Sequence, residues 1–332
     1  MRCRLVRVNT LKIMSEQEKV LNSFIVDLFE GKQTSSSTKL KTKSGWCLRD
    51  GMNHVLKAKE HSLFKIVRQV GLPDIYDSSI CRHEAVKQQG EKNQSSTSRY
   101  QEPKNCFQSL CRIVAGQQLA GSAVTAIWRR FVEVTENNVT PTEILRLAQI
   151  GLETHLQKPA GLSRAKAHTI VALAKAFEEG SLNETFLTSM STSEEQIRSA
   201  LLKIKGIGPW SCDMFLIFYL ERPDIFPIGD LGVRKGVAKL FTLRGNGRKG
   251  MLCPKKDFDL MEQVMQPYRP YRSLATYYMW KIADKKTMTN EEDENDKKTG
   301  ISSEERKLEI KPTLVMTPDR RKSKRIRRQV TP

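Results

Sequence analysis

Helical periodicity is the feature that most constrains the fold of this chain. From residue 104 to residue 283, apolar residues recur at intervals of three and four, the spacing that gathers them on one face of a helix. Runs of alternating apolar and polar residues are almost absent, and no fixed period repeats. The sequence therefore predicts an all-α domain over residues 50–285, without the repeats of a solenoid.

Local signals place several helix starts within this domain. Pro141 suits a first helical turn, where its missing N–H costs nothing, and Ser163 and Ser193 are candidate N-caps. The helices expected are 53–72, 105–118, 120–134, 141–156, 163–178, 193–204, 209–221, 231–242, 257–265 and 270–283.

The two ends of the chain and one internal stretch lack this pattern. Residues 1–49 are predicted to form a mobile arm with one possible helix at 16–30, and the polar stretch 83–102 is predicted to be a loop insertion. Residues 286–332 are predicted to form a disordered charged tail. The basic cluster 320–328 in that tail indicates a nuclear import signal, an extra phosphate-binding arm or merely a solvated tail.

The charge balance points to a polyanionic partner. Lysine and arginine number 56 against 37 aspartates and glutamates, a net charge of +19. Much of this excess lies in the middle of the chain, so a basic surface that approaches phosphates is expected on the folded body. This disfavours an ordinary cytosolic metabolic enzyme.

Cysteine and histidine usage gives no sign of a metal. The seven cysteines have no C-x-x-C spacing, which favours free thiols in a reducing compartment, and the five histidines show no ligand spacing. No apolar run is long enough to span a membrane. We therefore expect no metal, no organic cofactor and no membrane segment.

The most informative segment is 194–242. It contains the hairpin 203–210, in which Gly206 and Gly208 flank one apolar residue between two helices. Such glycines adopt conformations closed to other residues and leave bare backbone N–H groups at the start of the next helix, which suits a phosphate oxygen. Asp230 follows directly before an amphipathic helix. It is either only an N-cap or a catalytic carboxylate that the helix dipole helps to keep ionised.

Five segments, in order, carry a resemblance to a known family. They are IVAGQQLAGSAVTAIWRRF (113–131), AGLSRAKAHTIVALAKAF (160–177), LKIKGIGPWSCDMFLIFYL (202–220), DIFPIGD (224–230) and PYRPYRSLATYYMW (267–280). The chain resembles the helix–hairpin–helix DNA glycosylase superfamily, in particular its 3-methyladenine DNA glycosylase II branch. The resemblance implies two helical subdomains that flank a cleft.

The resemblance also assigns roles within the site. Asp230 matches the family's aspartate that stabilises the oxocarbenium-like sugar and helps to position water. Trp210 stands where bifunctional relatives carry a Schiff-base lysine, which implies an enzyme without lyase activity. Trp210 and Trp280 match aromatic walls of the base pocket, where electron-rich indoles attract a cationic alkylated purine. Met214 replaces a further pocket aromatic.

The predicted DNA contacts surround this site. Gly116, Gln117, Gln118 and Leu119 match the part of the family that approaches the minor groove. The resemblance implies that Gln118 or Leu119 fills the gap left by an extruded nucleotide. Asp213 is a rival carboxylate for which a structural role is favoured. The candidate contacts to the DNA backbone are Gly206 and Gly208 with Lys203, Lys205, Arg222, Arg234 and Lys235.

The predicted function is a monomeric, monofunctional DNA glycosylase that removes alkylated purines from double-stranded DNA, with an AP endonuclease as a possible downstream partner. The alternatives are a bifunctional glycosylase/lyase and a DNA-binding module in which Asp230 is only a cap. The basic tail predicts a nuclear protein. A weak presequence before Met14 allows a mitochondrial pool, and alternative initiation there is an equal possibility.

Overall fold

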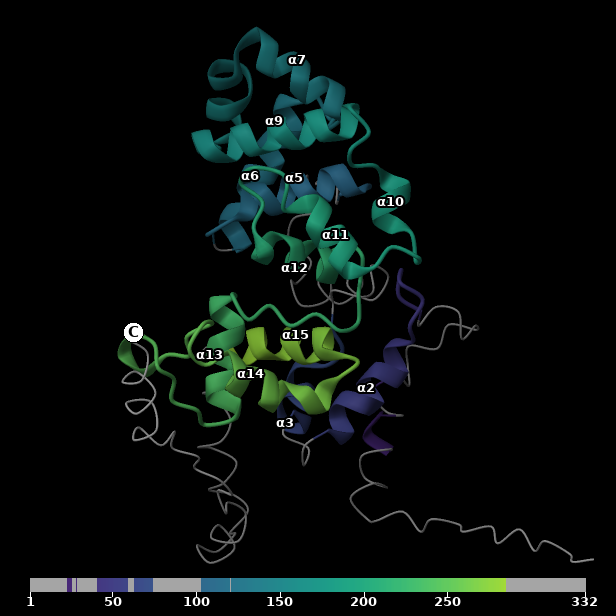
Figure 1. The fold of residues 1–332 in the computed structure, drawn as a ribbon, viewed down its shortest axis with the longest axis vertical. Helices are drawn as coiled ribbons and strands as arrows, with labels where there is room; N and C mark the ends of the chain where they lie inside the picture. Colours follow the sequence, from purple (N-terminus) through teal and green to yellow (C-terminus); the bar gives the residue numbers. More distant parts are fainter. Residues whose placement is uncertain are drawn as a thin grey trace, which may run out of the picture. The chain divides into compact units, whose positions relative to one another are not determined.

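The computed structural model of this chain consists of helices joined by turns (Figure 1). In the part that it describes, the only extended pairing is an isolated bridge between Lys41 and Cys47. The all-α prediction is confirmed, while the predicted insertion 83–102, the tail 286–332 and its cluster 320–328 lie outside the described part. The described residues are 23–25, 28, 41–58, 63–73, 103–119 and 121–284.

A first group of helices, from the middle of the chain, encloses one hydrophobic core. Helix α9 lies against α5 and α7, and α5 also packs on α6 and α12. Phe131, Ile170 and Phe215 are fully buried in this core. The group comprises α5 (Cys106–Gly116), α6 (Gly121–Val134), α7 (Pro141–Leu152), η4 (Glu153–Gln157), α8 (Lys158–Ala160), α9 (Arg164–Glu178), α10 (Glu184–Thr188), α11 (Glu194–Leu201) and α12 (Pro209–Phe218).

A second group joins residues from both sides of the first and encloses its own core. Helix α15 is central, because α2, α3 and α13 all pack on it. Met52, Tyr268 and Tyr278 are fully buried here. The two cores agree with the two predicted helical subdomains. The group comprises α2 (Leu48–Lys57), α3 (Phe64–Val70), α13 (Leu231–Leu240), η5 (Arg248–Gly250), α14 (Phe258–Met265), η6 (Gln266–Tyr268) and α15 (Arg272–Ala283).

The helix starts follow the predicted local chemistry. Pro141 is the first residue of α7, and the Ser163 hydroxyl accepts from the amide of α9's third residue. Ser193 and Gln196 form a reciprocal capping box at α11. The single helix expected over 53–72 is wrong, because the chain leaves helical conformation after Lys57 and α3 is a separate helix.

The segment 41–47, predicted to belong to the mobile arm 1–49, instead lies against the folded body. The backbone N–H of Lys43 donates to the Glu221 carboxylate at 2.6 Å, and Trp46 Nε1 donates to the Glu221 carbonyl at 2.7 Å. Glu221 is only 7 % exposed. Hydrogen bonds to one buried residue therefore fix the segment that leads into α2.

The connector 219–230 between the two groups is held by the start of α15. The Arg272 guanidinium pairs with Asp224 at 2.7 Å. The Ser273 hydroxyl donates to the Arg222 carbonyl and accepts from the Ile225 amide, at 2.6 and 2.9 Å. These bonds satisfy polar groups that a connector between two cores would otherwise bury without partners.

The hairpin between α11 and α12 packs closely on α9. Gly206 has a φ of +96°, and a Cβ there would lie 1.9 Å from the Thr169 hydroxyl oxygen. Both the backbone conformation and the space exclude other side chains. The predicted need for glycine at this turn therefore has two separate causes.

The crossing of α13 and α15 is equally close (Figure 1). A Cβ on Gly236 would lie 2.1 Å from the Met279 carbonyl oxygen, and one on Gly232 would lie 2.8 Å from Trp280 Cδ1. Residues four apart share a helix face, so these two glycines form one smooth strip on α13. That strip lets the α15 backbone approach.

Three cysteine side chains are buried in the first core, namely those of Cys106, Cys111 and Cys212. Burial raises the pKa of all three thiols, that of Cys212 to about 11. They are free thiols, as predicted.

The helix crossing yields a stability prediction. We expect Gly236→Ala to lower the free energy of unfolding by roughly 2 kcal/mol or more, because the added methyl group forces the two helix backbones apart. Chemical denaturation followed by circular dichroism measures this. Gly229→Ala is the matched control, since a Cβ at Gly229 meets nothing within 4 Å, and equal losses for both variants would contradict the prediction.

Candidate active site

The Asp230 carboxylate is the centre of the site. Oδ2 accepts from Trp210 Nε1 at 2.8 Å, and Oδ1 accepts from Trp280 Nε1 and from the Val233 backbone N–H, both at 2.8 Å. Hydrogen bonds to an ionised acceptor are stronger than neutral ones. A carboxylate offers about four acceptor positions, so one lone pair on Oδ2 remains after these three bonds.

The donors to Asp230 come from three different helices. Trp210 is the second residue of α12, Trp280 lies on α15, and Val233 is in the first turn of α13, for which Asp230 is the N-cap. Trp280 packs against both hydrophobic cores. The carboxylate therefore lies where the two helical groups meet, with the positive end of the α13 dipole beside it.

An aromatic stack extends the site from Trp280. The Phe218 ring lies parallel to the Trp280 indole, with centroids 5.4 Å apart and planes at 17°. Phe218 is 41 % exposed, which is high for a large apolar side chain at the end of a buried helix. Sequence reasoning missed Phe218, because its place at the end of an apolar run gives no sign that it leaves the core.

Asp213, the rival carboxylate, has a structural role. It is 8 % exposed and pairs with the Arg198 guanidinium of α11 at 2.6 Å. Burial raises the pKa of Asp213, Arg198 opposes that rise, and the negative charge of Asp230 adds to it. The ion pair joins α11 to α12, the two helices of the hairpin, which agrees with the structural role favoured for Asp213.

The hairpin directs the start of α12 outward. Gly208 is the N-cap, and a Cβ there would meet nothing within 4 Å, so its backbone is open to a ligand. Pro209 occupies the first helical position, as predicted. The first N–H groups of a helix have no partner within it and suit an anion such as a phosphate oxygen.

Residues 111–252 match the model of the HhH-GPD superfamily of base excision DNA repair proteins. A DNA-3-methyladenine glycosylase of Schizosaccharomyces pombe is 32 % identical over 186 residues, covering 56 % of this chain and 75 % of that protein. This chain belongs to the HhH-GPD superfamily.

Two further comparisons place it within the superfamily. A DNA-3-methyladenine glycosylase of Saccharomyces cerevisiae is 28 % identical over 207 residues, covering 54 % of this chain and 68 % of that protein. The solved structure of the S. pombe enzyme Mag1 in complex with abasic DNA is 26 % identical, with a TM-score of 0.51. The matched region covers 70 % of this chain and 95 % of the Mag1 chain. The predicted family resemblance is confirmed.

The segment expected to approach the minor groove forms the tip that follows α5. Gln118 has a φ of +59°, and Leu119 is 41 % exposed, a large apolar side chain directed away from either core. Gln117 Nε2 instead donates to the Gly206 carbonyl and to Ser211 Oγ, each at 3.0 Å. Gln117 therefore ties this tip to the hairpin of the HhH-GPD fold, whereas Gln118 and Leu119 are presented outward.

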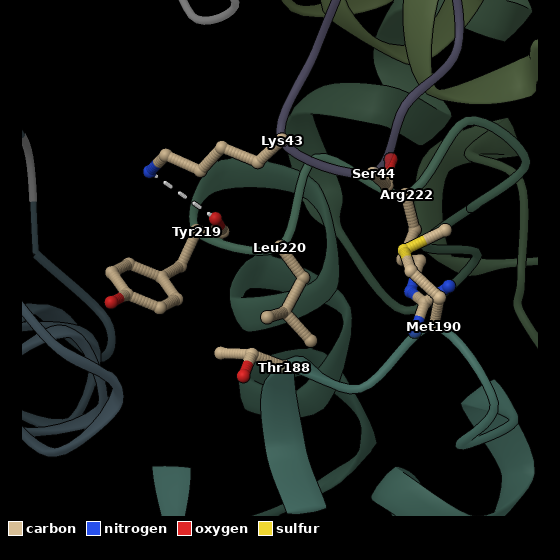
Figure 2. Close-up of a pocket in the computed structure, with 7 residues that line it drawn as sticks. All are labelled: Lys43, Ser44, Thr188, Met190, Tyr219, Leu220 and Arg222. Carbon is tan, nitrogen blue, oxygen red and sulfur yellow. Dashed lines mark hydrogen bonds between the residues drawn. The ribbon is translucent and has the colours of Figure 1, made fainter. Parts of the chain in front are cut away.

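Not all of the predicted phosphate contacts face solvent. Lys203, Lys205 and Lys235 are exposed. Arg222 instead donates to the carbonyls of Ser189 and Thr192, at 3.3 and 3.1 Å. It lines a cavity of about 100 Å³ with six other residues, which are Lys43, Ser44, Thr188, Met190, Tyr219 and Leu220 (Figure 2).

Two further predicted site residues make contacts within the fold. Arg234 donates through NH1 to the Leu252 carbonyl at 2.5 Å and is half-buried, so it braces a loop. Met214 is 5 % exposed within the first core, so its side chain belongs to packing more than to an open pocket wall. Sequence position alone cannot distinguish these roles, because both residues lie on helices next to the site.

In the described part of the chain, no three histidine, cysteine, aspartate or glutamate side chains cluster as a metal site would require. None of the helices described there combines the length and apolar character needed to cross a membrane.

The hydrogen bonds to Asp230 yield a spectroscopic prediction. The chain has four tryptophans, so four indole N–H signals are expected in a ¹⁵N–¹H correlation spectrum. We expect Asp230→Ala to move two of them upfield, those of Trp210 and Trp280, because each loses a charged acceptor. The signal of Trp46, whose indole binds the Glu221 carbonyl, serves as the internal control. Unchanged signals from Trp210 and Trp280 would contradict the geometry.

Proposed function

We propose that this chain is a monofunctional DNA glycosylase that removes alkylated purines from double-stranded DNA by hydrolysis of the N-glycosidic bond. The main support is the Asp230 carboxylate, which accepts hydrogen bonds from two indoles and from the first turn of α13. The chain also belongs to a superfamily of base excision DNA repair proteins. The relatives named 3-methyladenine glycosylases support the substrate class.

The chemistry asked of Asp230 is charge stabilisation. As the bond between C1′ and the base nitrogen breaks, its electron pair leaves with the base and positive charge develops on the sugar. A fixed carboxylate beside C1′ lowers the energy of that state, since its donors are already in place before the reaction. A water molecule then adds to C1′, and its proton passes to the remaining acceptor position on Oδ2 or to solvent.

Aromatic side chains next to Asp230 suit an alkylated base. A purine alkylated at N3 or N7 is cationic, so it leaves without further protonation and is attracted to indole faces. Trp210, Trp280 and the stacked Phe218 supply such surfaces beside the carboxylate. Stacking is worth about 1–3 kcal/mol per base. The proposed substrates are therefore bases such as 3-methyladenine and 7-methylguanine.

When a nucleotide is extruded from the duplex, a protein side chain must fill the gap that it leaves. Gln118 and Leu119 are proposed to fill the gap, because they form an outward tip tied to the hairpin through Gln117. Hairpin amides and the exposed Lys203 and Lys205 would hold the DNA backbone. The product is an abasic site, which is the substrate of an AP endonuclease.

The first test of this function replaces the carboxylate. Asp230→Asn should lower base release from methylated duplex DNA at least ~100-fold under single-turnover conditions, because the amide carries no charge to oppose that on the sugar. Binding to undamaged duplex should persist. Free bases in the supernatant, separated by chromatography, give the rate and identify the substrate.

Asp213→Asn is the matched control, since it changes the other carboxylate near the hairpin. It should retain base release to within a few-fold, with folding checked by circular dichroism. Base release that survives in Asp230→Asn would refute the assignment of Asp230 as the catalytic carboxylate. Absence of base release by the wild-type chain would instead favour a DNA-binding module in which Asp230 is only a cap.

The second test separates hydrolysis from lyase chemistry. A bifunctional enzyme forms a Schiff base with C1′, which borohydride reduces to a stable protein–DNA adduct. Trp210 has no amine, so we expect no adduct from the wild-type chain, whereas Trp210→Lys tests whether an amine at this position reaches the sugar. An adduct with the wild-type protein would show that another amine attacks C1′ and that the monofunctional proposal is wrong.

A further inference from the structure

The stretch that follows Asp230 concentrates positive charge. Residues 231–256 contain eight basic side chains and not one aspartate or glutamate. Most of these side chains are exposed, which places a large share of the chain's positive charge directly after the candidate catalytic carboxylate. The eight are Arg234, Lys235, Lys239, Arg244, Arg248, Lys249, Lys255 and Lys256.

A groove of about 270 Å³ runs along the outer face of α13 within this stretch. The face of α13 next to the glycine strip supplies Leu231, Lys235 and Lys239, at the spacing of successive turns. Leu231 and Met251 are 45 % and 42 % exposed, so the groove combines apolar surface with lysines. We call this the basic groove. Its lining residues are Leu231, Arg234, Lys235, Ala238, Lys239, Gly250, Met251, Leu252 and Ala283.

The loop that forms the far wall of the basic groove is firmly held. Asp257, only 3 % exposed, accepts from the backbone N–H groups of Asn246 and Cys253 at 2.8 and 2.7 Å. Burial acts to raise the pKa of the Asp257 carboxyl, but the hydrogen bonds from these amides outweigh burial and lower that pKa. Arg234 holds the same loop through the Leu252 carbonyl. Asp257, the first acidic residue after this stretch, is thus bound to the loop backbone.

We propose that the basic groove is a second DNA-binding site, which holds the sugar–phosphate backbone of the strand on one side of the extruded nucleotide. The inference rests on the proposed function, because it places that nucleotide at Asp230. Lysines suit the phosphates as point charges, and Leu231 and Met251 suit the apolar faces of the deoxyriboses.

The dimensions of the groove fit a short length of one strand. From Leu231 to Lys239, α13 rises by about 12 Å at 1.5 Å per residue, which corresponds to about three nucleotides at 3.4 Å each. The groove begins one residue after Asp230, so a strand that leaves the site on this side meets it directly. An acidic protein partner would require no such continuity with the carboxylate.

The test compares two triple variants, both in the Asp230→Asn background so that binding is measured without turnover. The first is Lys235→Gln, Arg248→Gln and Lys249→Gln, which removes charge from the groove and its loop. The matched control is Lys57→Gln, Lys65→Gln and Arg68→Gln on α2 and α3, which removes the same residue types from exposed positions. The probe is a labelled duplex with a central abasic analogue, followed by fluorescence anisotropy across a range of salt.

The groove variant should bind at least ~10-fold more weakly at low salt, and its slope of log K against log salt should be shallower by about 2–3, since each lost phosphate contact contributes about 0.9. The control should stay near the parent. Shortening the duplex on one side of the abasic analogue should abolish the difference between parent and groove variant, and shortening it on the other side should preserve it.

Equal slopes for the two triple variants would overturn the inference, as would a defect that persists when either side is shortened. Loss of binding to poly-glutamate with DNA binding unchanged would assign the groove to an acidic protein and also overturn it. Failure of the proposed function is distinguishable, because it would appear as absence of base release by the wild-type chain whatever the slopes.

Discussion

The three hydrogen bonds to the Asp230 carboxylate are the interaction on which the arrangement of the site depends. They join the start of α12, the last turn of α15 and the first turn of α13, so one charged group links the hairpin group of helices to the other core. The two indoles fix the direction of the carboxylate. Because every donor is part of a packed helix, the carboxylate is oriented before any substrate arrives.

Close helix packing makes those bonds possible. The Gly232 and Gly236 strip lets α15 approach α13 until the Trp280 indole reaches the Asp230 carboxylate. Similarly, Gly206 lets the hairpin lie on α9, and Gln117 fixes the tip of α5 to that hairpin. The same device, a glycine at a contact too close for a Cβ, thus positions both the candidate catalytic residue and the segment expected to enter the duplex.

The sequence predicted the helical class, the capped starts at Ser163 and Ser193 and the family, because each depends on spacing or on residues close together in the chain. It also singled out Asp230, Trp210 and Trp280 as candidate site residues. It could not show that both indoles donate to one carboxylate, since that contact joins helices 20 and 50 residues away from Asp230. For the same reason Arg222 and Arg234 were expected to reach phosphates, whereas the structure uses them to hold backbone carbonyls. Lys43 and Trp46 looked like part of an arm because their partner, Glu221, is about 175 residues away.

Burial of three thiols in the first core affects how they react with methylating agents. Cys106, Cys111 and Cys212 keep their protons at neutral pH, since burial raises the pKa of each of them. Electrophiles that methylate nucleobases also attack sulfur, but they react with the thiolate and need access to it. The three core thiols, protonated and enclosed, would therefore escape methylation by the same agents that damage the bases.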